Sequence, residues 1–254
     1  MSEVEAPASS SSGETCRAAI RYHACLVYQF LVIGAGPWPR TLRPERRGPP
    51  TIEEVKGRQQ NTFRIIGGEH RGRRLAFPPP GREAASYGAI RPSPDRVRET
   101  VFNWLAPVLA GARCLDLFAG SGAMGLEALS RGAAHCRFID LNPAAIAAIR
   151  EHLGLLAMGA RAEAAVGSAT AALATPPTEP FDLVFLDPPY DADLLAGSIA
   201  ALDENGWLAP GAAIYLEHRR QDSVPALPPD WTLARSKQAG DVAYHLAWKQ
   251  APGG

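Results

Sequence analysis

The sequence is poor in several features that would assign it to particular classes of protein. It has four cysteines, Cys16, Cys25, Cys114 and Cys136, and none of them forms a Cys-x-x-Cys pair. Two of them fall in apolar runs that read as strands, so buried free thiols are favoured over a disulfide framework or a metal site. We therefore expect no bound metal.

Long apolar runs and an excess of charge of one sign are also missing. The longest apolar run, residues 24–35, is interrupted by Tyr28 and Gln29 and is shorter than the roughly eighteen residues that a membrane-spanning helix needs. No association with a membrane is expected. The formal net charge is +0, so the whole molecule exerts no long-range attraction on nucleic acid, and any such binding must come from a local cluster.

One local cluster of positive charge lies between residues 58 and 98. It contains nine basic residues, all arginine, against three acidic residues. We predict that Arg71, Arg73 and Arg74 contact nucleic-acid phosphates, with a merely solvated face as the alternative. The nine are Arg58, Arg64, Arg71, Arg73, Arg74, Arg82, Arg91, Arg96 and Arg98.

Residues 1–57 differ in composition from the rest of the chain. They contain a serine run, a short apolar patch and a stretch rich in proline and arginine, which we interpret as a mostly disordered extension. Two alternatives are a secretory signal, because Arg17 and Arg21 precede the patch, and a start codon assigned too far upstream. Mass spectrometry of the natural N-terminus separates them, since an intact Met1 or Ser2 excludes the last one.

Residues 58–110 are expected to form a basic β-hairpin followed by a helix. Residues 63–67 and 73–77 are extended runs around glycines, typical of a small hairpin whose tip carries the arginines. The helix is predicted to begin with Ser93 as its cap and Pro94 at its first position. Apolar residues then recur at helical spacing, so that this face packs inward while Arg96 and Arg98 need not. The apolar residues are Val97, Val101, Phe102 and Leu105.

Residues 111–254 predict an α/β domain. Apolar runs typical of strands alternate with runs typical of helices, which indicates a parallel sheet covered by helices. Residues 231–237 and 242–248 are joined by only four residues, so a hairpin is expected, with the final strand antiparallel at a sheet edge. The fold class is thus a Rossmann-like sheet of seven strands, the last one antiparallel. The earlier strands are predicted at 113–118, 136–141, 161–166, 181–187 and 212–217.

The glycine-rich stretch 116–125 has the pattern of a nucleoside-binding loop. Gly120, Gly122 and Gly125 match Gly-x-Gly-x-x-Gly between a strand and a helical run, and Asp140 ends the next strand twenty residues beyond Gly120. Glycines permit the tight turn and close approach of a ligand, and the Asp140 carboxylate can accept both ribose hydroxyls. The pattern alone fits a dinucleotide or S-adenosylmethionine, and a plain turn without ligand is the remaining alternative.

Asp116 favours S-adenosylmethionine as the cofactor. A carboxylate just before the loop would repel a pyrophosphate but attracts an ammonium and a sulfonium. Ser168 and Ala169 end the third strand, where an adenine could be held, although Ser168 is equally well explained as a helix cap. The predicted cofactor-binding residues in these segments are Asp116, Phe118, Gly120, Ser121, Gly122, Asp140, Leu141, Ser168 and Ala169.

The second motif, Asp187-Pro188-Pro189-Tyr190, follows the apolar run 183–186. Its prolines stiffen the backbone and lack N–H donors, which leaves carbonyl groups available to a ligand. The Asp187 carboxylate, ranked first as an acceptor and second as a base, and the Pro188 carbonyl can each accept one N–H of an exocyclic amine, while Tyr190 stacks on the base. A stiff turn with an exposed tyrosine is the alternative. Together the two motifs predict an amino methyltransferase.

Further motifs lie on both sides of these two loops, and with them the chain from about residue 58 onward resembles the RsmD type of bacterial 16S ribosomal RNA guanine-N2 methyltransferase. The Asp-Pro-Pro-aromatic loop alone is shared with adenine-N6 and cytosine-N4 enzymes, whereas the arginine-rich hairpin and the Arg-Pro helix resemble this family in particular. The additional motifs are Arg64 to Gly68, Arg71 to Arg73, Arg91-Pro92, Asp95 to Thr100, Phe102 to Leu105, Glu127 to Ser130 and Asn205 to Leu208.

This resemblance implies a class I methyltransferase fold with S-adenosylmethionine as methyl donor, and methylation of one guanine in assembled or assembling small ribosomal subunits. It also implies a cytoplasmic, monomeric enzyme, and contact of Arg91 with the methionine end of the cofactor. The extension at residues 1–57 and the long linker at 78–89 depart from the family pattern and put the reach of the hairpin in question.

Three other functions are considered. A DNA adenine or cytosine methyltransferase usually carries a separate target-reading domain, for which this chain has no room. A dinucleotide-dependent oxidoreductase would bind NADH and show no affinity for S-adenosylmethionine. A non-catalytic RNA-binding module would have an eroded cofactor loop, and nothing in the motifs is eroded.

Overall fold

The computed structural model describes residues 61–77, 94–189 and 194–251. The chain divides into two units, Met1–Gly57 and Arg58–Gly254, and every described residue belongs to the second. The predicted extension therefore lies outside the described residues, as do Cys16, Cys25, Ser93, Arg91 and Tyr190. The separation of residues 58–110 from 111–254 stays a prediction.

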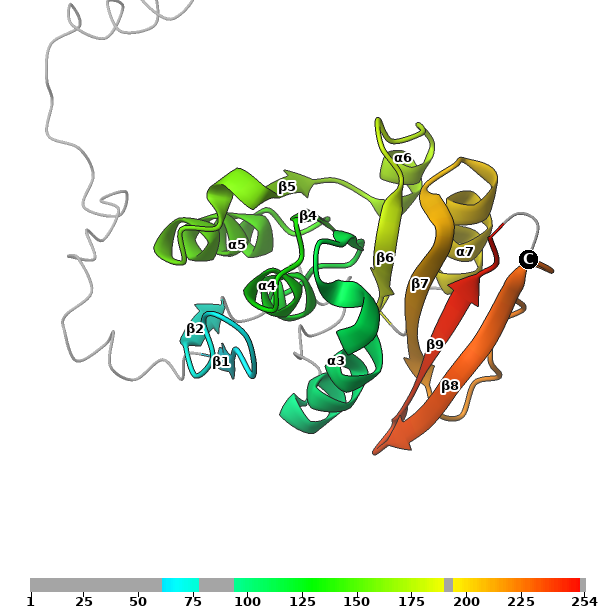
Figure 1. Cartoon of the computed structure of the whole chain (residues 1–254), viewed down its shortest axis with the longest axis horizontal. Coiled ribbons are helices and arrows are strands. Elements are labelled where there is room, and N and C mark those ends of the chain that lie inside the picture. Colours follow the sequence, from blue (N-terminus) through cyan, green and yellow to red (C-terminus); the bar gives the residue numbers. More distant parts are fainter. Residues whose placement is uncertain (1–60, 78–93, 190–193, 252–254) are drawn as a thin grey trace, which may run out of the picture. The chain divides into compact units, whose positions relative to one another are not determined.

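The second unit is built on a seven-stranded sheet in the order β5-β4-β3-β6-β7-β9-β8 (Figure 1). β9 runs antiparallel to both of its neighbours, whereas β3, β4, β5, β6 and β7 pair in parallel, which confirms the predicted α/β class and the antiparallel last strand. The strands are β3 (Arg113–Asp116), β4 (His135–Asp140), β5 (Ala162–Val166), β6 (Phe181–Leu186), β7 (Leu208–Arg219), β8 (Trp231–Ala239) and β9 (Val242–Lys249).

The place of β9 in the sheet corrects one prediction. The final strand was expected at the edge, but β9 pairs with β7 on one side and with β8 on the other, so β8 is the edge strand. Burial explains the order, because β9 is largely buried whereas residues 232–238 of β8 are exposed. The more apolar strand of the hairpin takes the inner position.

Helices cover both faces of the sheet (Figure 1). β6 shows the effect on the sequence, since Leu183 and Phe185 join the core on one face and Val184 and Leu186 join it on the other. A strand buried on both faces gives a continuous apolar run. The first face carries α3 (Asp95–Leu109), α4 (Ala123–Ser130) and α5 (Pro143–Leu155), the second carries α6 (Ala169–Leu173) and α7 (Leu195–Glu204), and the short 3-10 helix η3 (Gly159–Arg161) precedes β5.

Two further properties concern the described residues only. None of their helices combines the length and apolar character needed to cross a bilayer, and no group of three or more His, Cys, Asp and Glu residues is placed to hold a metal ion. Cys114 and Cys136 are buried free thiols on neighbouring strands, as predicted. Burial raises the pKa of both thiols, which makes them poor nucleophiles.

The predicted hairpin is present, formed by β1 (Asn61–Arg64) and β2 (Arg74–Phe77). Its strands are shorter than predicted because residues 65–73 form a long turn. Phe63, Leu75 and Phe77 are buried in the same core as α3, α4 and α5. The hairpin is thus attached to the sheet domain through apolar contacts.

α3 begins at Asp95, with Pro94 at the cap position and no side-chain cap, instead of with Pro94 as its first residue. Its predicted apolar face is confirmed, since Val97, Val101, Phe102 and Leu105 are all buried.

Arg98 differs from the expectation for this helix, because it is fully buried while Arg96 is exposed. Its Nη2 donates hydrogen bonds to Asp95 Oδ1 at 2.6 Å and to the Arg64 carbonyl at 2.7 Å. Its Nη1 lies 3.7 Å from Oε2 of Glu127, which is also fully buried. A charged side chain is tolerated in a core when such partners surround it.

The packing of α4 on β4 generates a prediction. A methyl group on Gly125 would overlap the Phe138 ring and the Cys136 sulfur, whereas one on Gly154, near the end of α5, would meet open space. We expect Gly125→Ala to lower the free energy of unfolding by about 1–3 kcal/mol and Gly154→Ala to leave it unchanged or raise it by up to about 1 kcal/mol. Urea unfolding of both variants measures this, and equal effects would contradict the packing described.

Candidate active site

The glycine loop joins β3 to α4 by a tight turn. Gly120 and Gly122 have φ of 50° and 76°, left-handed values that glycine adopts without strain. The Gly122 amide donates to the Ala119 carbonyl at 2.6 Å, and the Leu126 amide donates to the Gly122 carbonyl at 2.9 Å. α4 therefore starts directly at the turn, with its N-terminus at the carboxyl edge of the sheet.

Asp140, the last residue of β4, holds this loop from the side. Its Oδ2 accepts the Gly120 amide at 2.7 Å, and its Oδ1 accepts the Asn142 amide at 2.7 Å. Burial raises the pKa of its carboxyl, and the two amides oppose that rise. Each carboxylate oxygen has two lone-pair sites, so acceptor capacity is left for a ligand hydroxyl.

Asp116, the last residue of β3, has a buried carboxylate that is only 4% exposed. Its Oδ2 accepts the Gly125 amide at 3.0 Å, which ties β3 to the first turns of α4. Burial raises its pKa from 3.8 to about 7; the Gly125 hydrogen bond lowers it, and the nearby Asp140 charge raises it again. A carboxylate held in this way favours a cation as its neighbour.

The Asp-Pro-Pro segment lies beside this loop at the same edge of the sheet. β3 and β6 are adjacent and parallel, Asp116 is paired with Phe185, and Asp187 follows β6 directly. The chain runs from β3 outward to β4 and β5, then returns to β6 on the other side, so the strand order reverses here. Ligands of open α/β sheets bind at such a point. Asp187 is half-buried and Pro188 buried.

An apolar surface follows along the carboxyl ends of β4 and β5. Leu141 is 43% exposed and Val166 is 49% exposed, and they are two of six exposed large apolar side chains among the described residues. Ser168 accepts the Ala171 amide and caps α6, so the cap role is confirmed and a ligand contact of its side chain stays a prediction. Phe118 is half-buried against the core. Exposed apolar groups here suit the flat face of a nucleobase.

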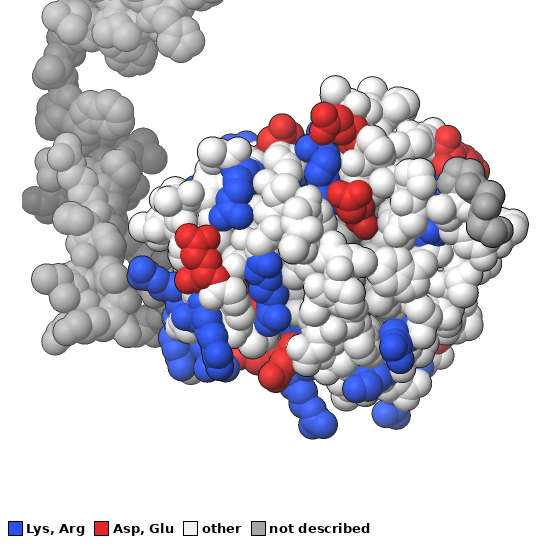
Figure 2. All heavy atoms as spheres, in the orientation of Figure 1, with Lys and Arg blue, Asp and Glu red and all other residues white. Residues whose placement is uncertain are grey.

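The predicted RNA-binding arginines lie on the β1–β2 hairpin. Arg71, Arg73 and Arg74 are all exposed, as is Arg64. Figure 2 shows Lys and Arg side chains gathered over this hairpin, on a molecule whose net charge is +0. We call residues 65–74, which contain the three predicted arginines, the arginine turn.

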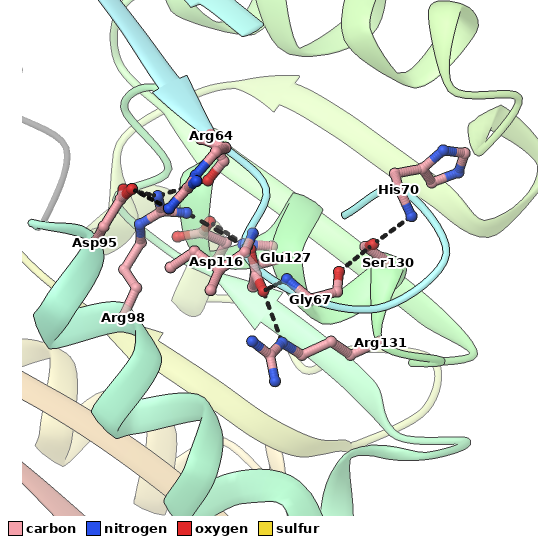
Figure 3. Close-up of polar contacts among 11 residues, drawn as sticks. Arg64, Gly67, His70, Asp95, Arg98, Asp116, Glu127, Ser130 and Arg131 are labelled. Atoms are coloured by element: carbon pink, nitrogen blue, oxygen red, sulfur yellow. Dashed lines mark hydrogen bonds and ion pairs between the residues drawn. The ribbon is translucent and has the colours of Figure 1, made fainter. Parts of the chain in front are cut away.

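The arginine turn is attached to α4 by polar contacts (Figure 3). The Glu127 carboxylate accepts the Ile66 amide at 2.7 Å, the Gly67 amide at 2.8 Å and Arg131 Nε at 2.6 Å. Glu127 is fully buried. α4 therefore holds the glycine loop at its N-terminus and the arginine turn farther along its length.

The structure thus brings together some predicted residues and not others. Asp116, Ser121, Asp140 and the Asp-Pro-Pro segment meet at one edge of the sheet, whereas the arginine turn is attached beyond the middle of α4. The roles of these residues in binding and catalysis stay predictions. The sequence reasoning missed Val166, for which the signal was an apolar residue at a strand end. Glu127 was named only as part of a family motif, and its contacts with Ile66 and Gly67, about sixty residues earlier, were missed because no local pattern indicates them.

The model of the family described as Conserved hypothetical protein 95 matches residues 63–248. Ribosomal RNA small subunit methyltransferase D of Escherichia coli K12 is 47% identical over 75% of this chain and 92% of its own length, and that of Haemophilus influenzae is 42% identical over 72% and 92%. The chain belongs to the ribosomal RNA small subunit methyltransferase D family.

The fold of this family agrees with the structure described above. The solved structure of yhhF from Escherichia coli superposes with a TM-score of 0.67 and 45% identity, covering 75% of this chain and 99% of that chain. The resemblance to the RsmD type is thereby confirmed. The family model leaves residues 1–62 of this chain unmatched, because its match begins at residue 63.

The buried carboxylate of Asp116 generates a prediction about stability and pH. Because its folded pKa is raised from 3.8 to about 7, the wild-type protein loses stability as pH rises from about 4 to 7. Asp116→Asn lacks this loss. The free energy of unfolding of the variant, taken relative to that of the wild type, should therefore be higher at pH 8 than at pH 5 by about 2–3 kcal/mol. Urea unfolding at both pH values measures it. Asp182→Asn is the control, because Asp182 is an exposed aspartate on β6. A difference in free energy of unfolding between Asp116→Asn and the wild type that does not change with pH would contradict the raised pKa of Asp116.

Proposed function

We propose that this chain transfers a methyl group from S-adenosylmethionine to the exocyclic N2 of one guanine in 16S ribosomal RNA. The specific target implied by the resemblance is guanine 966. One observation carries the proposal: Asp116 and Asp187 lie at the carboxyl ends of two adjacent parallel strands, where the strand order of the sheet reverses. A cation-binding carboxylate and an amine-binding segment are thereby neighbours.

The residues at this edge fit S-adenosylmethionine. Asp116 is a buried carboxylate with a raised pKa, as expected of a group that awaits a cationic ligand such as the ammonium or sulfonium. Asp140 has acceptor capacity for ribose hydroxyls, and the exposed Leu141 and Val166 offer apolar surface to an adenine. Arg91 is proposed to contact the methionine end, and lies outside the described residues. When bound, the cofactor supplies an electrophilic methyl group.

The Asp-Pro-Pro-Tyr segment is proposed to hold the guanine. The Asp187 carboxylate and the Pro188 carbonyl accept one N–H each from the amino group, which turns its lone pair toward the methyl group. Asp187 acts first as this acceptor and second as the base that takes the proton after transfer. Pro189 stiffens the segment, and Tyr190, outside the described residues, stacks on the base.

The arginine turn is proposed to bind phosphates of the ribosomal RNA. Its three arginines are exposed, and RNA recognition by a protein without net charge requires such a local cluster. Methylation of a base demands that it leave its stack, which phosphate contacts outside the pocket can support. The proposed partner is the small ribosomal subunit, the proposed compartment is the cytoplasm where subunits assemble, and the proposed state is a monomer.

The first experiment tests the reaction itself. Small subunits from a strain lacking the enzyme are incubated with the protein and tritiated S-adenosylmethionine, and the labelled nucleotide is mapped. Label on the N2 of one guanine supports the proposal. Label on an adenine or cytosine amine would favour the wider amino methyltransferase class, and binding of NADH without affinity for S-adenosylmethionine would favour an oxidoreductase.

Asp187→Ala is predicted to separate catalysis from cofactor binding. The variant should lose methyl transfer by at least about 100-fold, because the amino group loses its acceptor, while its affinity for S-adenosylmethionine stays within a few fold. Asp182→Ala is the matched control, since Asp182 is an exposed aspartate at the other end of the same strand. Turnover of the Asp187 variant at the wild-type rate would end the proposed role.

Changing Arg71, Arg73 and Arg74 together to alanine is predicted to weaken RNA binding and to flatten its dependence on salt. Each lost phosphate contact lowers the slope of log affinity against log salt by about one unit. Arg235→Ala with Lys237→Ala serves as control, because these exposed cations lie on the edge strand β8. An unchanged slope in the triple variant would show that its arginines are only a solvated face.

A further inference from the structure

The buried carboxylate of Glu127 lies where the arginine turn meets α4, and it belongs neither to the glycine loop nor to the Asp-Pro-Pro segment. We propose that Glu127 is a positioning residue, which fixes the arginine turn relative to the cofactor loop so that bound RNA is held at a set distance from the methyl donor. This inference rests on the proposed function. Glu127 would act through the turn, without touching RNA or cofactor.

The contacts of Glu127 are of an unusual kind for a helix residue. Both oxygens are used: Oε2 accepts the Ile66 amide and lies near Arg98, and Oε1 accepts the Gly67 amide and Arg131 Nε. Two of these donors are main-chain amides of a segment sixty residues earlier in the chain. A carboxylate that binds backbone fixes the path of that backbone, whatever side chains it carries.

The two cations around Glu127 are themselves fixed by aromatic rings. The Arg98 guanidinium lies 5.6 Å from the centre of the Phe63 ring in β1, and that of Arg131 lies 5.1 Å from the centre of the Phe102 ring in α3. Glu127 is therefore the common partner of the hairpin, α3 and α4. Loss of its charge would leave Arg98 and Arg131 without their shared anion.

A second set of contacts attaches the turn near the end of α4. The Ser130 hydroxyl donates to the Gly67 carbonyl at 2.7 Å and accepts the His70 amide at 3.0 Å, and the Ser130 carbonyl accepts the Glu69 amide at 2.7 Å. Gly68, with φ of 76°, lies so close that a methyl group on it would overlap the Ser130 carbonyl. The turn thus lies directly on the helix backbone.

α4 acts as a short rigid spacer between the two functions. All eight of its residues are buried, so it is held by packing along its whole length. Glu127 is five residues and Ser130 eight residues beyond Gly122, which corresponds to about 7.5 Å and 12 Å along the axis. The cofactor loop begins this helix and the arginine turn is attached near its other end, so movement of one relative to the other is restricted.

The test uses the full chain and three variants. Glu127→Gln keeps the side-chain shape but removes the charge and turns an amide N–H₂ toward donors. Gly68→Ala displaces the turn from Ser130 without touching the buried charges. Gly111→Ala is the matched control, because Gly111 also has a positive φ, 78°, but lies outside the arginine turn, and a methyl group on it meets nothing within 4 Å.

Four measurements are made for each protein well below its unfolding temperature. They are the affinity for small ribosomal subunits, the KM and kcat of methyl transfer to them, the affinity for S-adenosylmethionine, and the hydrogen exchange of the amides of residues 66–70. For Glu127→Gln and Gly68→Ala we expect faster exchange of these amides and a KM and Kd for the particles raised by about tenfold or more, the size expected when hydrogen bonds to a charged group are lost. Affinity for S-adenosylmethionine should stay within about twofold.

Gly111→Ala should differ little from the wild type in all four measurements. Affinity for the particles that is unchanged in Glu127→Gln and Gly68→Ala, despite faster exchange, would overturn the inference, and so would a loss of S-adenosylmethionine affinity that parallels the loss of RNA affinity. If the wild type itself transfers no methyl group, the proposed function fails, whereas the role of Glu127 is still decided by the affinities and the exchange.

Discussion

The hydrogen bond from the Gly125 amide to the Asp116 carboxylate holds the end of β3 against the first turns of α4, and the candidate site is arranged around this contact. It fixes where the glycine loop can run, because the loop has only residues 117–122 to connect the two elements. Asp140 then closes the loop from the next strand through the Gly120 amide. Two acidic strand ends therefore hold one turn of backbone.

This arrangement also has an energetic cost. A carboxylate as buried as that of Asp116 is disfavoured in its charged form, and the neighbouring Asp140 charge adds to the cost. A second carboxylate close to the buried Asp116 lowers stability, but such an arrangement is common where a site has to attract a cation. The apolar packing of α4 against β4 offsets this cost, and Gly125 allows the helix to lie close to Cys136 and Phe138 of the strand.

Much of the fold could be predicted because its signals are local. The apolar run of β6 and the glycine turn each depend on residues next to one another in the chain, and the structure confirms them. The predicted position of β9 was wrong because spacing alone predicts a hairpin and does not show which of its two strands pairs with the rest of the sheet. Comparing apolar content would have helped, since β9 is the more apolar of the two.

The errors at the site have a different origin. The side chain of Arg98 was not expected to be buried. Its burial depends on Glu127, 29 positions later, and on the Arg64 carbonyl in β1. No periodicity within α3 contains that information. The edge where Asp116, Asp140 and Asp187 gather could be predicted, since parallel strands end together, but the attachment of the arginine turn to α4 is a tertiary contact between distant segments.

The unfavourable burial of Asp116 has a consequence for how long the protein survives in a cell. A ligand that binds only the folded form and neutralises this carboxylate shifts the unfolding equilibrium in proportion to its concentration. With the methyl donor bound as proposed, scarcity of the donor raises the unfolded fraction that proteases can degrade. The abundance of the enzyme would then follow the methylation capacity of the cell without any dedicated regulator.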